Sequence, residues 1–312
     1  MKNRYKKIVF EDKNGKILNH VAKEGETFEV TEGASGELII KASAIPVNNA
    51  CSKNYANPPI PEGYAYSWGE WYNGYIIKRL SDASQFVWVP VGYLDDDGTL
   101  DGENFNEKFG RRNYRNNEFS DGEYHEDLRR EFLRQVESVK KYGGFYISRY
   151  NISKSSTGKP QSVKGVMPWV NIDFNDAKKV AAKIESSEAV TSHLTYGAEY
   201  DSVLAWFIKS KARTFGEIAK NSTNWGNYWN TKNSPKKVVK TGSNEAWCTN
   251  GIYDFAGNVD EWIQEQNDSS FRVIRGGFYR NDGNYHPVSC RCNNNPFYRY
   301  HFTGFRTTLC IK

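Results

Sequence analysis

The chain has 312 residues, of which 38% are hydrophobic, and its mean hydropathy is −0.74, so it can form a sizeable core beneath a strongly polar surface. The net charge of +5 is spread along the chain, which argues against a nucleic-acid partner, and no run reaches the roughly 18 apolar residues that membrane insertion requires. No signal peptide follows the basic N-terminus, so we expect synthesis in the cytoplasm, and the five cysteines, an odd number, do not predict a disulfide scaffold.

Residues 1–45 predict a small β module. Strand-like runs lie at 5–11, 17–18, 27–31 and 37–40, and residues 12–15 (Asp-Lys-Asn-Gly) are typical of a hairpin turn. The module shows no catalytic chemistry, so we expect it to serve as an attachment or spacer. Residues 46–62 are rich in Pro and Asn and are expected to form a linker, which leaves residues 63–312 as the main domain.

The main domain mixes strands and helices. Residues 86–91 form a nearly continuous apolar run, which predicts a strand buried on both faces, and residues 144–150 predict another strand. Apolar residues at helical spacing predict helices within 123–142, 175–187 and 198–210. Residues 95–122 are expected to form a surface insertion, in which the acidic run 95–98 is a solvated turn rather than a cation loop. From residue 226 onward we expect short strands and long loops, and the fold class is therefore α+β.

The last stretch of the chain lies between Arg275-Gly-Gly and Gly304-Phe-Arg. Residues 276–306, called here the C-terminal segment, show neither the period of a helix nor that of a strand, and they are crowded with Asn, Tyr, Arg and Phe. A run of this kind between two fixed ends is typical of exposed chain that displays a binding surface.

Several phrases in order resemble the formylglycine-generating enzyme (sulfatase-modifying factor) family, whose fold is a variant of the C-type lectin fold. They are residues 86–90, 144–150, 170–177 and 194–201, then NGIYDFAGNVDEW at 250–262, and finally the Arg-Gly-Gly and Gly-Phe-Arg phrases. The resemblance runs from about residue 57 to the end of the chain. It implies a C-type-lectin-like domain behind the β module.

The resemblance also bears on activity. In the enzymes of the family, two cysteines separated by four residues bind copper and activate oxygen, whereas Cys290 and Cys292 are separated by one residue. The related sulfoxide synthases bind iron through histidines on an additional helical domain, which this sequence lacks. We therefore expect neither copper nor enzymatic activity. The enzyme alternative is a metal-dependent oxidase that uses Cys290 and Cys292, because neighbouring thiolates can bind a soft metal.

The resemblance further implies a structural calcium ion in the turn of residues 254–261. The ligands carried over by position are Asp254, Gly257, Val259 and Glu261, and two carboxylates with two carbonyls suit Ca²⁺. The alternative is a turn held by the Asp254 side chain without metal.

The composition of the C-terminal segment suggests how its sequence arose. Its 31 residues include no Lys, Glu, Gln, Met or Trp, although about a fifth of the chain belongs to these types and roughly six would be expected. All residues present are encodable by codons that end in a pyrimidine. A diversity-generating retroelement produces this outcome, and its variable proteins resemble this family. A fixed binding loop is the alternative.

We therefore predict a non-enzymatic ligand-binding protein, either a retroelement-diversified variable protein or a receptor-binding component of a phage or prophage tail or baseplate. Large stiff aromatic rings, adaptable amides and charged groups are typical of binding surfaces. The expected ligand is a cell-surface glycan or protein, and the β module is expected to contact other tail proteins of the particle. A structural virion subunit is a further alternative. The candidate ligand-binding residues are Tyr279, Asn281, Asn284, Tyr285, His286, Arg291, Asn293, Asn294, Asn295, Phe297, Tyr298, Arg299, Tyr300 and His301. Phe278, Phe302 and Phe305 are assigned to the core.

Overall fold

The protein is described here by a computed structural model. It describes residues 3–5, 7–11, 17–21, 26–32, 38–44, 58–69, 74–91, 109–114, 118–119, 125–126, 130–266 and 270–312, with only the backbone described up to residue 44. Within these residues no helix is long and apolar enough to cross a membrane.

The N-terminal residues form strands, as predicted. One antiparallel sheet has the order β1-β4-β5, and a separate hairpin pairs β2 with β3, with Glu11 opposite Ile17. The bounds are β1 Asn3–Tyr5, β2 Lys7–Glu11, β3 Ile17–Val21, β4 Glu26–Glu32 and β5 Leu38–Ala44. The turn at 12–15, most of the linker at 46–62 and the acidic run at 95–98 lie outside the described residues, and the domain boundaries stay predictions.

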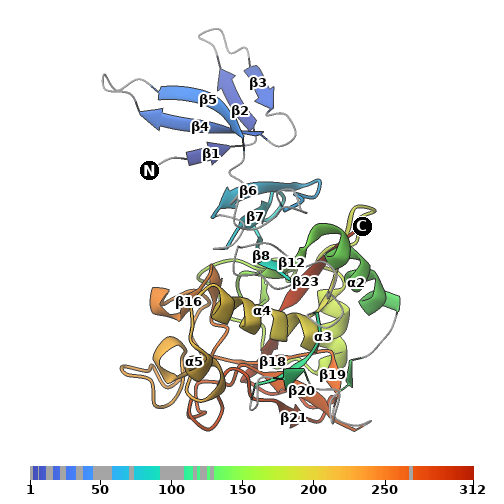
Figure 1. The fold of residues 1–312 in the computed structure, drawn as a ribbon, viewed down its shortest axis with the longest axis vertical. Helices are drawn as coiled ribbons and strands as arrows, with labels where there is room; N and C mark the ends of the chain where they lie inside the picture. The colour runs from blue at the N-terminus through green and yellow to red at the C-terminus, as the bar shows by residue number, and fades with distance from the viewer. Residues whose placement is uncertain are drawn as a thin grey trace.

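An antiparallel six-stranded sheet forms the centre of the main domain, in the order β15-β23-β12-β8-β7-β6 (Figure 1). The last strand of the chain lies between β12 and β15, so the C-terminal strand completes the core. The bounds are β6 Tyr64–Trp68, β7 Ile76–Arg79, β8 Gln85–Pro90, β12 Gly144–Ser148, β15 Val190–Leu194 and β23 Thr307–Ile311.

The predicted buried strand is confirmed as β8. Phe86 and Trp88 pack into one hydrophobic cluster, while Val87 and Val89 pack into another, because successive side chains of a strand point to opposite faces. Residues of α2, α4 and α5 belong to the cluster of Val87, and residues of α3 belong to the cluster of Phe86. Helices therefore cover both faces of the central sheet.

The three predicted helices are confirmed, although their bounds differ from the expectation. They are α2 Arg130–Tyr142, α3 Phe174–Ala181 and α4 Gly197–Lys209. The first begins later than residue 123 because His125–Glu126 form strand β11, and Gly143 follows it with φ of 75°, as a C-terminal glycine should. A further helix, α5 Phe215–Ala219, was not predicted; its five residues are too few to show a period.

A second, four-stranded sheet has the order β21-β20-β18-β22 and carries the C-terminal segment. Its strands are β18 Asp260–Trp262, β20 Arg272–Arg275, β21 Cys292–Asn294 and β22 Thr303–Phe305. Short two-stranded pairs complete the description: β9 Arg112–Asn113 with β10 Glu118–Phe119, β11 with β19 Glu265–Gln266, β13 Ser153–Lys154 with β14 Pro160–Gln161, and β16 Cys248–Thr249 with β17 Ile252–Tyr253.

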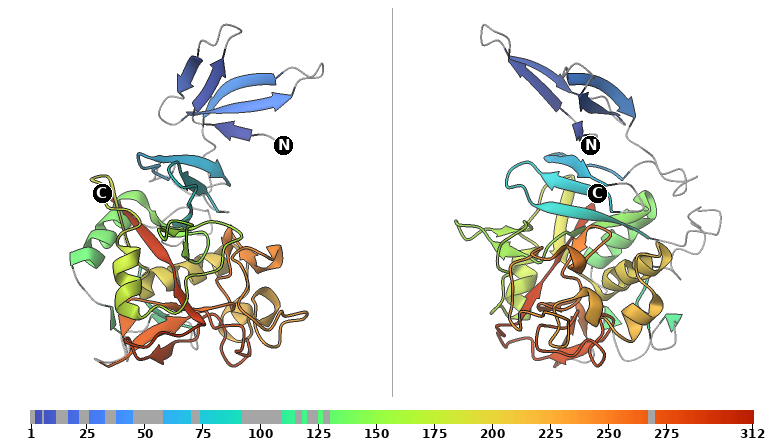
Figure 2. Two further views of the ribbon diagram at one scale, coloured as in Figure 1. Left: turned by 180° about the vertical axis from the view of Figure 1, so that it is seen from behind. Right: turned by 90° about the vertical axis from the view of Figure 1, so that its left-hand side faces the viewer.

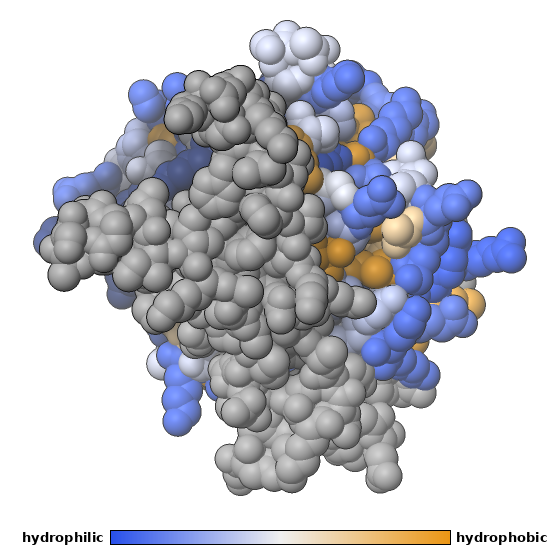
Figure 3. All heavy atoms as spheres, turned by 90° about the horizontal axis from the view of Figure 1, so that it is seen from above, coloured by the Kyte–Doolittle hydropathy of each residue, from blue (hydrophilic) through white to orange (hydrophobic). Residues whose placement is uncertain are grey.

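The second sheet and strand β6 lie at opposite ends of the main domain. In both views of Figure 2 the orange and red strands of the second sheet lie at the bottom, and β6 and β7, in cyan, lie at the top of the main domain, below the blue N-terminal strands. Seen from above, the described surface is mainly hydrophilic, with hydrophobic residues in small patches (Figure 3). The chain thus enters the domain at β6, far from the C-terminal segment.

Candidate functional site in the C-terminal segment

Buried ion pairs fix both ends of the C-terminal segment. Before it, the Arg275 guanidinium donates to Asp201 Oδ1 at 2.8 Å, and both side chains are fully buried. At its end, Arg306 Nε donates to Glu261 Oε1 at 2.7 Å, again in the interior. The two ends flank strand β18, since β20 pairs with it antiparallel and β22 pairs with it in parallel. The segment therefore has both ends locked into one sheet, and its own strand β21 pairs with the same sheet between them.

The glycines that open the segment have a conformational reason. Gly276 and Gly277 have φ of 89° and 74°, where side chains are disfavoured. The Gly276 carbonyl accepts the Tyr228 hydroxyl at 2.6 Å, and a Cβ atom on Gly277 would lie 2.8 Å from the Tyr228 ring. Close packing against this tyrosine therefore explains the Arg-Gly-Gly phrase.

Arg291 was predicted to contact a ligand, but the structure places its side chain largely in the interior. Only 10% of its side chain is exposed; Nε donates to Glu265 Oε1 at 2.7 Å, and Nη2 is paired with Asp201. Burial alone would raise the pKa of Asp201, but the charges of Arg291 and Arg275 outweigh burial and lower it. Arg291 neutralises two buried carboxylates and has no free donor face at the surface.

Tyr279 was also predicted to be a contact residue, and its side chain is buried at 6% exposure. It lies at the inner end of a ladder of aromatic rings. Tyr298 contacts Tyr300 at a centroid distance of 6.2 Å, and Tyr300 contacts Phe302 at 5.3 Å. Phe302 stacks on Phe278 at 4.1 Å, and Phe278 contacts Tyr279 at 5.6 Å. The term "aromatic ladder" below means these five residues.

The ladder corrects the assignment of the three phenylalanines. Phe305 is fully buried, as predicted, but Phe278 and Phe302 are only half-buried and belong to the ladder. The ladder runs from the exposed Tyr298 to the buried Tyr279, so each outer ring packs against a ring that is less exposed. Sequence spacing could not show this, because the ladder joins the two ends of a non-periodic segment.

The remaining candidates divide by exposure. Tyr285, Phe297 and Tyr298 are 81%, 73% and 58% exposed. The other exposed candidates are Asn284, Asn293, Arg299 and His301, and the half-buried ones are Asn281, His286, Asn294, Asn295 and Tyr300. Arg299 pairs with Asp173 at 2.9 Å and also contacts Asp176, so it is a surface charge with partners.

Two of the predicted amides build turns. Asn281 Oδ1 accepts the backbone N–H of Phe278 at 2.9 Å, and Asn295 Oδ1 accepts that of Phe297 at 3.0 Å. Such bonds from an Asn side chain to nearby backbone fix a turn. Their oxygens therefore hold the segment in shape, and the exposed Asn284 and Asn293 are better placed to meet a ligand.

Trp229 was not predicted and lies beside the segment. Its backbone N–H donates to the Asn281 carbonyl at 2.8 Å, its side chain is 52% exposed, and Lys236 Nζ lies 3.9 Å from a ring centroid. In the sequence, the only signal for Trp229 is a tryptophan within a stretch rich in Gly and Asn, where a buried aromatic is not expected. The structure thus adds an aromatic group from another part of the chain.

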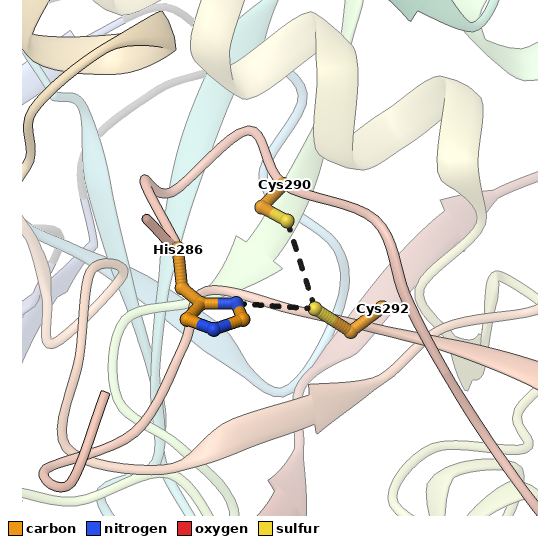
Figure 4. A group of neighbouring side chains, drawn as sticks. All are labelled: His286, Cys290 and Cys292. Carbon is orange, nitrogen blue, oxygen red and sulfur yellow. Dashed lines mark hydrogen bonds between the residues drawn. The ribbon is translucent and has the colours of Figure 1, made fainter. Parts of the chain in front are cut away.

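Cys290 and Cys292 lie together with His286, which sequence spacing did not indicate (Figure 4). The two Sγ atoms are 3.6 Å apart, and Cys292 Sγ is 3.6 Å from His286 Nδ1. The hydrogen bond with Cys292 lowers the pKa of the Cys290 thiol to about 6, although burial opposes the shift. The same contact, together with burial, raises the pKa of Cys292. The contact between the two sulfur atoms therefore favours ionisation of Cys290 over that of Cys292.

The predicted calcium turn brings Asp254 and Glu261 into the interior. Asp254 Oδ2 accepts the Gly242 N–H at 2.8 Å, and Glu261 Oε1 accepts from Asn151 and Arg306, while Asp254 Oδ1 and Glu261 Oε2 are buried without a hydrogen-bond partner. Burial raises the pKa of Asp254 to about 6 and also raises that of Glu261.

The backbone of this turn is tightly packed. Gly257 has φ of 72°, and a Cβ atom there would lie 2.6 Å from the Asn227 carbonyl oxygen. Gly257 and Val259 were expected to supply carbonyl oxygens to the ion, and the two unpartnered carboxylate oxygens fit a calcium ligand set with them. Arg306 is a rival source of positive charge at Glu261, and calcium stays a prediction.

Comparison with known proteins places the fold. A family model described as the Sulfatase-modifying factor enzyme 1-like domain matches residues 79–310. No curated protein matches the chain significantly. Among solved structures, the Treponema denticola variable protein 1 is 18% identical with a TM-score of 0.40, covering 55% of this chain and 85% of that one. CarF is 16% identical with a TM-score of 0.42, covering 54% and 87%.

PvdO from Pseudomonas aeruginosa is 15% identical with a TM-score of 0.45, covering 76% of this chain and 98% of that one. The family match extends over most of the chain and includes both ends of the C-terminal segment. The α+β fold with short strands and long loops is the one expected from the sequence phrases. The chain belongs to the Sulfatase-modifying factor enzyme 1-like domain family.

Proposed function

We propose that this protein binds a ligand without catalysis, through the outer end of the aromatic ladder and the exposed residues around it. The observation that supports this most strongly is the gathering of exposed aromatic side chains in a loop whose ends are locked. The described residues include nine exposed large hydrophobic side chains, and three of them lie in the C-terminal segment. The segment has 31 of the 215 residues whose side chains are described, so about one would be expected by length.

The surface is held in shape before a ligand arrives. Buried ion pairs of Arg275 and Arg306 fix its two ends, and the side chains of Asn281 and Asn295 fix turns within it. A rigid surface loses little conformational entropy on binding, which raises affinity. Exposed rings on such a support are therefore more favourable for binding than rings on a mobile loop.

The chemistry of the surface favours a cell-surface glycan. The exposed rings of Phe297 and Tyr298 offer flat apolar faces, and Asn293 and Arg299 are exposed polar residues of the same segment. A sugar ring has an apolar face and a polar edge, so it meets both kinds of group. A protein ligand is the alternative that the experiment distinguishes.

The placement of the surface fits a protein that is attached at its other end. The chain enters the domain at β6, and β21 lies at the opposite end (Figure 1). A module that precedes β6 can therefore bind a particle while the C-terminal segment faces outward. On this basis we propose a receptor-binding component of a phage or prophage tail or baseplate, or a retroelement-diversified variable protein.

A glycan array followed by calorimetry tests the proposal. The double change Phe297→Ala with Tyr298→Ala removes two exposed rings and should weaken binding at least about tenfold, as for residues at the centre of an interface. Trp68→Ala is the matched control, because Trp68 is 62% exposed but lies on β6 at the other end of the domain.

Loss of affinity in the control alone, or unchanged affinity in the double variant, would refute the assignment. If no glycan binds but a purified surface protein does, and the double variant loses it, the protein ligand replaces the glycan. A structural virion subunit predicts instead that the double variant changes the oligomeric state by analytical ultracentrifugation. A nearby reverse transcriptase gene with a near-copy of the C-terminal coding segment would establish diversification.

A further inference from the structure

Three metal-ligating side chains of the C-terminal segment converge beside the aromatic ladder. His286, Cys290 and Cys292 each offer a donor atom, and these atoms all lie within 4.8 Å of one another (Figure 4). It is the one group of three or more His, Cys, Asp or Glu side chains with this property among the described residues. We propose that the three residues bind one Zn²⁺ ion, which clamps the C-terminal segment.

The distances between the donor atoms suit a common ion. In a tetrahedral zinc site with Zn–S of about 2.3 Å and Zn–N of about 2.05 Å, two sulfurs lie about 3.8 Å apart, and sulfur and nitrogen lie about 3.6 Å apart. The Sγ–Sγ distance here is 3.6 Å, and the distance from Cys292 Sγ to His286 Nδ1 is 3.6 Å. The sulfurs are far beyond the length of a disulfide bond, about 2.05 Å.

Arg291 lies between the two cysteines in the chain. Its side chain reaches the buried Glu265 and Asp201, whereas Cys290 and Cys292 lie together with His286. Cys292 is fixed further by its place opposite Ile274 in the pairing of β21 with β20.

His286 and Cys290 are positioned by turns. The His286 N–H donates to the Asp282 carbonyl at 2.9 Å, and the Cys290 N–H donates to the Pro287 carbonyl at 2.8 Å. The donors therefore come from two turns and one strand, and the backbone brings them together before any ion is bound. A preformed site of this kind binds metal with little reorganisation.

The donor set selects the class of ion. Two thiolates and one imidazole are soft or borderline ligands, which favour Zn²⁺ and Cu⁺ over Ca²⁺ or Mg²⁺. Two thiolates would also balance the charge of a Zn²⁺ ion in this half-buried place. Zn²⁺ is usually four-coordinate, so three protein ligands leave a fourth coordination position open, whereas Cu⁺ can be three-coordinate.

Bound metal would tie the turn at His286 to strand β21. Tyr285, the most exposed of the candidate aromatics, is the neighbour of His286, so the clamp would limit its motion. The site does not depend on the proposed ligand, because metal binding is measured without any ligand present. Failure of the glycan experiment and failure of the metal experiment are therefore separate results.

The test uses the full chain, reduced and freed of metal. Titration with Co²⁺ should give one tetrahedral thiolate–cobalt spectrum per chain, and Zn²⁺ should remove it by displacement. Each of Cys290→Ser, Cys292→Ser and His286→Asn should weaken the metal at least about 100-fold, because even the loss of an outer-shell partner costs 10- to 100-fold. Cys248→Ser is the matched control, since this half-buried thiol lies outside the group.

Alkylation of the native protein supplies a second measurement that needs no variant. Stoichiometric Zn²⁺ should protect Cys290 and Cys292 from iodoacetamide, while the reaction of Cys248 is unchanged, as read by peptide mass mapping. The proposal is overturned if the reduced protein does not bind Zn²⁺, if the variants bind it as tightly as the native chain, or if Cys290 and Cys292 form a disulfide that reduction fails to open.

Discussion

Arginine residues 291 and 299 come from the same segment, and the structure predicts opposite results when each is replaced by alanine. Arg291 lies with Asp201 and Glu265, whose side chains are fully buried. Arg299 is 57% exposed and pairs with Asp173 and Asp176 at the surface. The comparison therefore tests whether burial, and not residue type, decides the role of each arginine.

The expected loss in unfolding free energy depends on which carboxylates keep a positive partner after each substitution. Removing one partner of a buried ion pair costs about 3–5 kcal/mol, because a buried charge is left without compensation. Arg275 still contacts Asp201 at 2.8 Å and Glu265 at 3.5 Å, so we expect the lower end, about 3 kcal/mol of unfolding free energy, for Arg291→Ala. For Arg299→Ala we expect at most about 1 kcal/mol, as for surface pairs.

Urea denaturation followed by tryptophan fluorescence measures both values at pH 7. The folded-state pKa of Asp201 is lowered, so the stability it contributes is present above its unfolded value of about 3.9 and is lost as pH falls through the folded value. The difference between the native chain and Arg291→Ala should accordingly hold from pH 7 down to about pH 4 and shrink as pH falls further. Equal costs for the two variants, or a difference that does not depend on pH, would show that the buried network does not act as described.

Two further predictions concern buried titratable groups. His193 Nε2 lies 2.8 Å from Glu199 Oε1 in the interior; burial would lower the pKa of His193, but the Glu199 charge outweighs it and raises the pKa. The stability that His193 contributes is therefore fully present below its unfolded pKa of about 6.5 and is lost as pH rises through its folded pKa. The melting temperature of the native chain should accordingly fall between pH 6 and 9, and that of His193→Gln should fall less. For the turn of Asp254, Ca²⁺ added to EDTA-treated protein should raise the melting temperature in the native chain but not in Asp254→Asn, and an equal rise in both would exclude this site.

Much of the fold could be predicted from sequence because its information is local. The apolar run at 86–91 has no polar position for solvent, so it had to be buried on both faces. The helices of Arg130–Tyr142 and Gly197–Lys209 follow from apolar spacing. Helix Phe215–Ala219 has too few apolar residues to show a period, and only packing onto the core reveals it.

The candidate site was less predictable because exposure in a non-periodic loop depends on distant partners. Tyr285, Phe297 and Tyr298 are exposed, as their predicted role requires, but nothing in the sequence shows that the Tyr279 ring turns inward. Trp229 lies some fifty residues earlier in the chain and reaches this surface through a hydrogen bond from its backbone N–H to the Asn281 carbonyl. Such contacts cannot be read from spacing.

The sequence by itself determined that the C-terminal segment is a loop between two fixed phrases, because its residues follow no secondary-structure period. The tertiary structure decided which of its side chains are available. Two buried carboxylates, Asp201 and Glu265, come from other parts of the chain and require a cation, so they draw Arg291 inward. Cys290 and Cys292, on either side of Arg291 in the chain, lie instead with His286. The burial of charged side chains from distant parts of the chain is not visible in any local sequence pattern. It is the physical reason why the sequence predicts the segment but not which of its side chains are exposed.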